Sequence, residues 1–112
     1  MNILKKSRED LSNKDLYFLL TDKSIKKMQE IAEKTINVVD YVLYEDVRRD
    51  TGEISKVLAI KTDNGTYATN SASFIECFEK IVECFGDDFK TISIMQGTSN
   101  RGRKYLQCSY VA

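Results

Sequence analysis

The chain contains no histidine and no proline, and its three cysteines are Cys77, Cys84 and Cys108. Cys77 and Cys84 stand seven residues apart, which on a helix is about two turns and too far for a disulfide bond. No further cysteine or histidine cluster completes a zinc site. We therefore interpret the cysteines as small buried apolar residues with reduced thiols, and we expect neither a metal ion nor a cofactor.

Catalytic motifs are equally scarce. The triplet Asp50-Thr51-Gly52 matches that of aspartic proteases, but their chemistry needs an apolar run that buries the paired carboxylates. Two arginines precede the triplet here, so a hairpin turn is the better interpretation. Glu76, Glu79 and Glu83 fall on the solvent face of a helix, and no second acidic element accompanies them. We expect a protein that is not an enzyme and has no small-molecule substrate.

Long apolar runs are also missing, since none approaches the roughly eighteen residues that a helix needs to cross a bilayer. The first residues, Met1-Asn2-Ile3-Leu4-Lys5-Lys6, lack the apolar region and the cleavage site of a signal peptide. We therefore expect a cytoplasmic protein with no membrane partner.

The net charge is zero, which argues against indiscriminate binding of polyanions. The distribution of charge is uneven, however. From Asp63 to Ile94 there are six acidic residues and two lysines, whereas from Met95 onwards there are three basic residues and no acidic one. A neutral chain can therefore still present a basic surface near its C-terminal end.

The order of the expected elements is the most informative positive feature. Strand patterns cover Thr35–Arg49, Ile54–Thr62 and Thr66–Thr69, an amphipathic helix follows at Ser71–Phe85, and two more strands follow at Phe89–Gln96 and Lys104–Val111. This is the order of the five-stranded OB barrel. We therefore predict a mostly-β α+β fold, with an OB-like barrel over residues 35–112 and a helix between its third and fourth strands.

Two further features refine this prediction. The alternation of the first strand slips near Val38-Val39 and again near Val42-Leu43, as in a strand that bends at a bulge and serves two sheets. Residues 1–34 are predicted to be a helical extension of the same domain. One helix there would be capped by Ser12, and a second would cover Asp22–Glu33. We expect this extension to close one end of the barrel.

The candidate binding site combines tyrosines on strands with basic residues in loops. Single-stranded nucleic acid needs aromatic faces that stack on bases and cations that follow phosphates. The predicted groove is lined by Lys56, Tyr67, Tyr105 and Gln107. Its predicted phosphate contacts are Arg48, Arg49, Arg101, Arg103 and Lys104.

Strand alternation sorts the remaining tyrosines. Tyr105 shares a face with Gln107 and is expected to be exposed, whereas Tyr110 falls on the opposite face and is expected to be buried. Tyr41 and Tyr44 are expected on opposite faces of their strand, so that only one of them is available to a ligand.

Several short strings of residues resemble those of one protein family. They are Leu11-Ser12-x-x-Asp15-Leu16-Tyr17, Val42-Leu43-Tyr44-Glu45-Asp46, Ala68-Thr69-Asn70-Ser71-x-Ser73-Phe74-Ile75 and Gly97-Thr98-Ser99-x-x-Gly102-Arg103. In these strings the chain resembles the small single-stranded DNA-binding proteins of phages of Gram-positive bacteria. The resemblance implies an OB-like homo-oligomer that coats displaced single strands during phage DNA replication or recombination, in the cytoplasm of the host bacterium.

A second class of function stays open. A small protein-interaction module, such as a phage-encoded inhibitor of a host enzyme, would also fit the zero net charge and the acidic helix face. The residues do not distinguish a preference for DNA from one for RNA.

Overall fold

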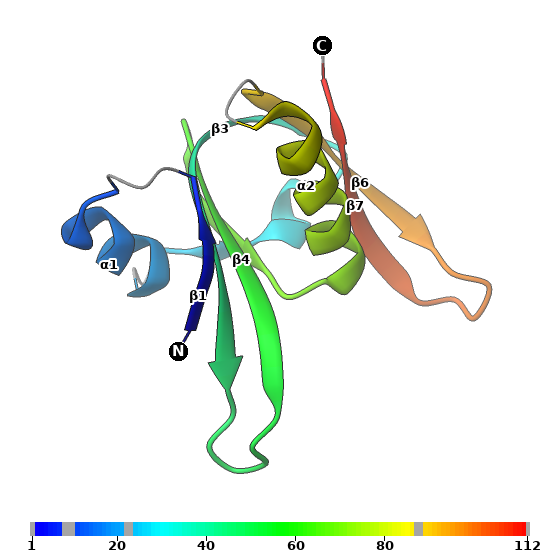
Figure 1. The fold of residues 1–112 in the computed structure, drawn as a ribbon. Coiled ribbons are helices and arrows are strands. Elements are labelled where there is room, and N and C mark those ends of the chain that lie inside the picture. The colour runs from blue at the N-terminus through cyan, green and yellow to red at the C-terminus, as the bar shows by residue number, and fades with distance from the viewer. Residues whose placement is uncertain (1, 8–10, 22–23, 87–88, 112) are drawn as a thin grey trace.

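The computed structural model describes residues 2–7, 11–21, 24–86 and 89–111. Within these ranges it contains a seven-stranded sheet and two α-helices (Figure 1). The elements are β1 (Asn2–Lys6), α1 (Asn13–Thr21), β2 (Lys26–Lys27), the 3₁₀ turn η1 (Met28–Ile31), β3 (Thr35–Val47), β4 (Ile54–Thr62), β5 (Gly65–Thr69), α2 (Ala72–Phe85), β6 (Thr91–Thr98) and β7 (Lys104–Tyr110).

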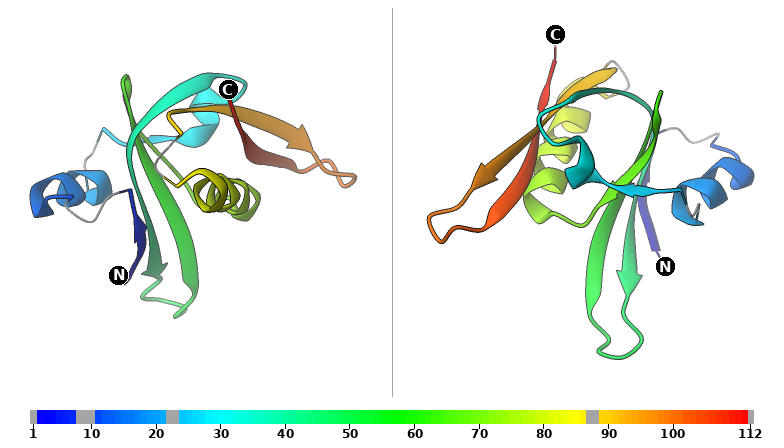
Figure 2. Two further views of the ribbon diagram at one scale, coloured as in Figure 1. Left: turned by 45° about the horizontal axis from the view of Figure 1, so that its top comes forward. Right: turned by 180° about the vertical axis from the view of Figure 1, so that it is seen from behind.

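The sheet has the order β2-β5-β4-β3-β6-β7, with β1 paired to β3 beside this path. The long strand β3 pairs with β6 through Thr35–Asn37 and with β4 from Val38 onwards, and a register shift lies between Val38 and Asp40. The predicted bulge is therefore confirmed near Val38-Val39, whereas Val42 and Leu43 keep a regular register with β4. Because β3 bends there, the sheet curls into an open half-barrel, and the β3–β4 and β6–β7 hairpins point in different directions (Figures 1 and 2).

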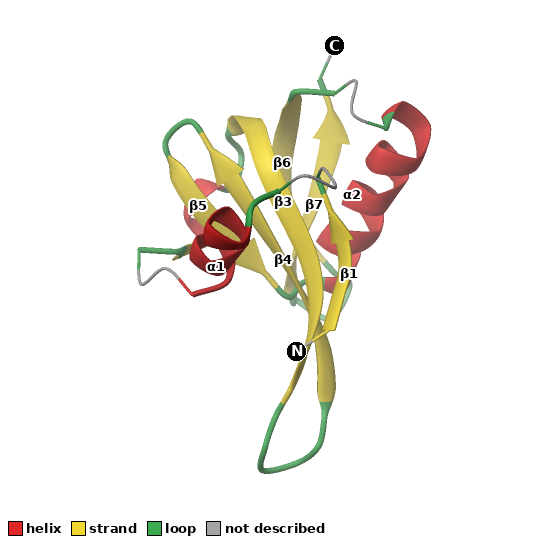
Figure 3. Ribbon diagram, turned by 60° about the vertical axis from the view of Figure 1, so that its left-hand side comes forward, coloured by secondary structure: helices red, strands yellow, loops and turns green. Residues whose placement is uncertain are grey.

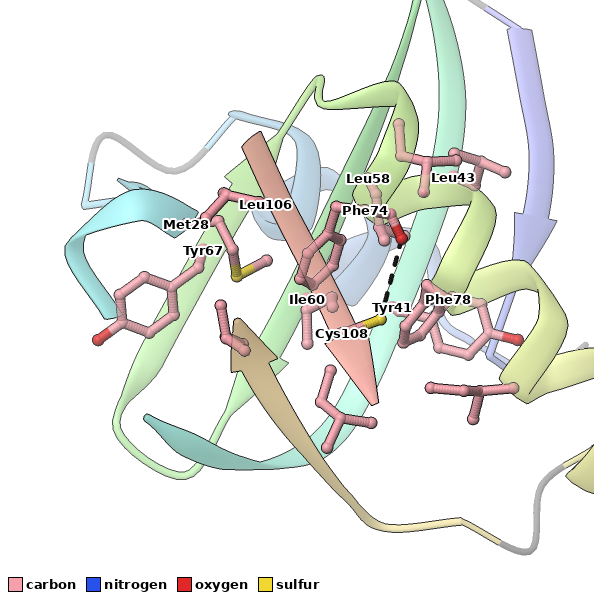
Figure 4. Close-up of a cluster of buried hydrophobic side chains, with 14 of the residues drawn as sticks. Met28, Tyr41, Leu43, Leu58, Ile60, Tyr67, Phe74, Phe78, Leu106 and Cys108 are labelled. Carbon is pink, nitrogen blue, oxygen red and sulfur yellow. Dashed lines mark hydrogen bonds between the residues drawn. The ribbon is translucent and has the colours of Figure 1, made fainter. Parts of the chain in front are cut away.

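Helix α2 fills the concave side of this sheet. Its N-cap Ser71 accepts a hydrogen bond from the backbone N–H of Phe74 at 3.4 Å, and Phe74 and Phe78 are almost fully buried. The ring of Phe78 meets Tyr41 of β3 edge-to-face, with 4.9 Å between ring centroids (Figure 4). The predicted helix is confirmed. Most of its apolar stripe is buried, but Phe85, expected on the same stripe, is 37% exposed.

Strand β7 is tied to α2 rather than to a further strand. The Ser73 hydroxyl donates to the carbonyl oxygen of Leu106 at 2.7 Å, and the thiol of Cys108 donates to the carbonyl oxygen of Phe74 at 3.9 Å. The first turns of α2 thus hold the edge of β7, which keeps the β6–β7 hairpin in place.

Helix α1 packs on the other, convex face of the sheet (Figure 3). Leu11 and Leu19 are buried there against Val42 of β3 and Ala59 of β4. The Ser12 hydroxyl accepts the backbone N–H of Asp15 at 3.1 Å, as predicted for a cap. The helix lies across the strands, and not over one end of a barrel as expected.

Two other expectations for the N-terminal extension are wrong. Residues 2–6 form the strand β1, which pairs with β3, so the extension is not helical throughout. In place of a second helix, Lys26–Lys27 pairs parallel with β5, and a single 3₁₀ turn follows. Met28 and Ile31 are both buried, and their spacing of three residues suits a 3₁₀ turn as well as an α-helix. Asp22 and Lys23 lie outside the described residues.

Among the helices in the described ranges, none combines the length and apolar character that crossing a bilayer would need.

Candidate nucleic-acid interface

The β6–β7 hairpin carries three of the predicted phosphate contacts on a tightly hydrogen-bonded turn. The N–H of Ser99 donates to the carbonyl oxygen of Arg103 at 2.8 Å, and the N–H of Gly102 donates to that of Ser99 at 2.9 Å. Gly102 has a φ of 80°, the left-handed conformation that closes a three-residue hairpin loop. Arg101, Arg103 and Lys104 are all exposed, and no salt bridge to another described residue engages them. This hydrogen-bonded turn therefore presents three exposed basic side chains, none of them ion-paired with a described residue.

The β3–β4 hairpin presents its arginines differently. The N–H of Arg48 donates to the carbonyl oxygen of Glu53 at 2.9 Å, which closes the loop. The Arg48 Nε lies 3.6 Å from the Asp50 carboxylate, and both side chains are exposed. Arg49 is exposed as well. Because Asp50 and Glu53 share this loop with the two arginines, its field is close to neutral.

Two adjoining hollows run from β4 to the β6–β7 hairpin, and we call them together the trough. The larger, of about 360 Å³, is lined by Lys27, Gln29, Val57, Ala68, Thr69 and Asn70. The smaller, of about 70 Å³, is lined by Gln29, Ser71, Gln96, Lys104, Tyr105 and Leu106. Gln29 belongs to both, so η1 marks the middle of the trough, and in the right-hand view of Figure 2 η1 lies between the two hairpins.

The lining of the trough combines basic and amide side chains with the apolar residues Val57, Ala68 and Leu106. Its charged lining residues are Lys27 and Lys104, and no carboxylate is among the described side chains that line it. The amides of Gln29, Asn70 and Gln96 supply both donors and acceptors. A polymeric ligand that carries negative charge and many hydrogen-bonding groups is complementary to such a surface.

Tyr105 adjoins the trough, and its ring lies across Gly97 of the neighbouring strand. The two residues are directly paired in the β6–β7 ladder. A Cβ atom at Gly97 would lie 2.8 Å from Cε2 of the ring and closer still to Cζ and Oη. The side chain of Tyr105 nevertheless remains 37% exposed, as predicted. The glycine thus allows the hydroxyl end of the ring to lie against the backbone of β6.

Tyr67 was predicted to line the groove, and this is wrong. The residue is 7% exposed and belongs to the core, where Figure 4 shows its ring near Met28 with the hydroxyl pointing away from the cluster. The reason is register: Tyr67 pairs with Ile60, which faces the core, so its neighbour Ala68 takes the outer face and lines the trough instead.

The other predicted groove residues are divided between surfaces. Lys56 is exposed but stands opposite Glu45 in the ladder, on the same side of β4 as the buried Leu58, and is not among the residues lining the trough. Gln107 is partly exposed and shares the outer face of β7 with Tyr105, by strand alternation. The structure therefore brings together Lys104, Tyr105 and the two nearby arginines, but not Lys56.

Tyr110 is a second correction. It is 40% exposed instead of buried, because it is the last residue of β7 and extends past the core. Its ring stacks on Phe85 at the end of α2, with 4.1 Å between centroids. Tyr41 and Tyr44 do lie on opposite faces: Tyr41 is in the core, and Tyr44 packs with the cluster under α1.

Among the described residues, the titratable groups with shifted pKa values, Tyr44 and Cys108, do not line the trough. Burial raises the pKa of Tyr44, with a further contribution from the negative charge of Asp46. Burial raises the pKa of Cys108 to about 12, and the nearby Cys77 thiol adds to the effect. Both groups stay neutral at physiological pH. No group of three or more acidic, cysteine or histidine side chains within the described ranges is placed to hold a metal ion.

Several surface residues were not predicted. Gln29 and Lys27 reach the trough only because β2 pairs with β5, a contact between segments about forty residues apart that no local pattern announces. Tyr17 and Phe18 on α1 are 62% and 48% exposed. Their position beside the leucines of an amphipathic helix could have indicated this exposure.

Comparison of the chain with protein-family models, with curated proteins and with solved structures finds no match in any of the three. The function must therefore be argued from the geometry of the trough and its two hairpins.

Proposed function

We propose that the protein binds single-stranded DNA without strong sequence preference and without catalysis. The observation that carries this proposal is the trough, lined by lysines and amides and bordered by an acid-free, basic β6–β7 hairpin. Phosphates would meet Arg101, Arg103 and Lys104, while the amides would meet base edges. The exposed ring of Tyr105 would offer one stacking surface.

The topology supports the same proposal. The run β5-β4-β3-β6-β7, with α2 between β5 and β6 in the chain, matches the strand and helix order of an OB barrel. In that fold the ligand crosses the second and third strands between two hairpin loops, which correspond here to the β3–β4 and β6–β7 loops. The larger hollow is lined by Val57 of β4 and by Ala68 and Thr69 of β5, the strands that would correspond to the second and third strands of an OB barrel.

The biological setting follows from the resemblance of the sequence motifs. On this proposal the protein coats displaced strands during phage DNA replication or recombination, as a homo-oligomer in the host cytoplasm. Coating needs tolerance of sequence, and amide side chains that can both donate and accept hydrogen bonds suit that need.

One observation favours the alternative, a protein-interaction module. Tyr17 and Phe18 contact each other on the surface of α1, with ring centroids 5.8 Å apart, and exposed aromatic pairs are common anchors of protein interfaces. On that reading the surface of α1 would bind a protein partner, and the β6–β7 cations would have no role in it.

The test is a titration of labelled poly-dT at several salt concentrations. The proposal predicts that the logarithm of affinity falls with the logarithm of salt, by about 0.7 for each phosphate contact. The double substitution Arg101→Ala/Arg103→Ala is expected to lower both the affinity and this slope. Binding that does not respond to salt, or none at micromolar protein, would contradict it.

A matched control removes two positive charges elsewhere. Lys80 pairs with Glu76 on the wet face of α2 at 3.8 Å, and Lys90 is exposed before β6. Lys80→Ala/Lys90→Ala changes the net charge equally but should leave the slope as in the unaltered protein. An equal loss in both double variants would mean that only bulk charge matters.

A further inference from the structure

The outer face of the β6–β7 hairpin contains more than one exposed group suited to a flat ligand. By strand alternation Met95, Gly97, Tyr105 and Gln107 share this face, and Gly97 pairs with Tyr105 while Met95 pairs with Gln107. Met95 is 38% exposed, close to the value for Tyr105, and Gln107 is partly exposed. A phenol ring, a thioether and an amide are thus within one diagonal step of each other.

The position of the ring depends on the absence of a side chain at Gly97. Glycine weakens the interior of a strand, and its φ here is not in the left-handed region, so backbone conformation does not require it. The glycine is required by the space available, because a methyl group at this position would collide with the edge and hydroxyl of the Tyr105 ring. The hydroxyl end of the ring is therefore held against the Gly97 backbone, while Tyr105 as a whole stays 37% exposed.

We propose that this face is a site for a single base, in which Tyr105 stacks on the base, the Gln107 amide meets its edge, and Gly97 is the residue that positions the ring. This inference rests on the proposed function and adds to it a defined base contact and the residue that orients it. Arg103, two residues before Tyr105, is placed to meet the phosphate of the same nucleotide.

The experiment compares two ligands of equal length and charge: oligo-dT, and an abasic phosphodiester chain that has no bases to stack. We expect the unaltered protein to prefer oligo-dT by about tenfold or more, as expected for stacking of one base. Gly97→Ala and Tyr105→Leu should each reduce this preference about tenfold while changing the affinity for the abasic chain little. Tyr105→Phe should retain the preference, and Ser93→Ala, on the same face of β6, is the control for a small substitution.

A structural readout accompanies the titration. The ring against Gly97 should give the Gly97 α-proton resonances a ring-current shift in the free protein, and Tyr105→Leu should abolish that shift. A preference that survives in both Gly97→Ala and Tyr105→Leu would overturn this inference and leave the proposed function intact. Absence of binding to either ligand by the unaltered protein would overturn both.

Discussion

The two hairpins carry similar numbers of arginines, yet their contributions to DNA binding should differ. In the β6–β7 loop, Arg101 and Arg103 have no acidic neighbour after Met95 in the sequence. In the β3–β4 loop, Arg48 lies 3.6 Å from the Asp50 carboxylate, and a cation already paired has fewer counterions to release when it meets a phosphate. Arg101→Ala/Arg103→Ala should therefore reduce the salt slope by about 1.4, and Arg48→Ala/Arg49→Ala by less than about 0.7.

The slopes translate into affinities. If Lys27, Arg101, Arg103 and Lys104 each meet one phosphate, the slope is about 2.8, and affinity falls about fifty-fold between roughly 50 and 200 mM salt. Without the two β6–β7 arginines the slope is about 1.4, and the same change of salt costs about sevenfold. The difference is large enough to measure with duplicate titrations.

Fluorescence anisotropy of an end-labelled dT oligonucleotide at three salt concentrations measures both slopes. Urea unfolding of each variant should show unchanged stability, because all four arginines are exposed loop residues. If the two double variants lose the same slope, the local pairing of Arg48 has no effect on binding. If only the β3–β4 variant loses slope, the DNA contacts the β3–β4 loop and not the β6–β7 loop, and the prediction is wrong.

Three further outcomes follow from particular contacts. Asp50→Asn should free Arg48 from its ion pair and raise poly-dT affinity up to about fivefold. Unchanged affinity would place the β3–β4 loop outside the interface. Tyr67→Phe should leave DNA affinity unchanged, whereas Tyr67→Ala should lower the free energy of unfolding in urea by about 3–5 kcal/mol, because the ring is buried. Cys108 ionises near 9.0 when unfolded but near pH 12 when folded, so the unfolded chain binds fewer protons between these values and stability should fall as pH rises. Relative to Cys108→Ala, the extra fall in urea melts should approach about 1.4 kcal/mol per pH unit above 9.

Much of the fold after Thr35 could be predicted because each element carries its own local signals. Phe74, Ile75, Phe78 and Ile81 of the predicted stripe have helical spacing and are buried as expected, although Phe85 at the end of the stripe is exposed. The turn at Asn64-Gly65 and the slip of alternation near Val38 each mark a feature that the structure contains. These signals agree with one another, which is why the order of elements was informative.

The N-terminal extension could not be predicted in the same way, because its strands exist only through distant partners. Asn2–Lys6 is a strand because the C-terminal half of β3 offers a free edge. Lys26–Lys27 is a strand because β5 offers it a free edge to pair with. Two-residue and five-residue strands with several lysines have no clear period, and helix propensity alone favours the wrong structure.

The candidate site was predictable where loop chemistry decides it and not where register decides it. The basic residues of the β6–β7 turn are exposed because a tight hairpin loop closed by a glycine projects into solvent. To predict the position of Tyr67, one would need to know which residue of β4 it pairs with. A register error of one position exchanges a core residue for a trough residue. Strand alternation alone gave the right face for Tyr105 because β7 keeps a regular register with β6 over its full length.

The N-terminal extension is part of the site as well as of the fold. The bend of β3 sends the two hairpins in different directions, and η1 occupies the space that this leaves between β5 and β6. Its Met28 is fully buried in the core, while the adjacent Gln29 lines both hollows of the trough. A fully buried anchor beside an exposed amide means that this polar group is held by core packing, not by a mobile loop. The trough is therefore assembled from an early turn, a central strand pair and a late hairpin, and its geometry depends on the same contacts that fold the chain.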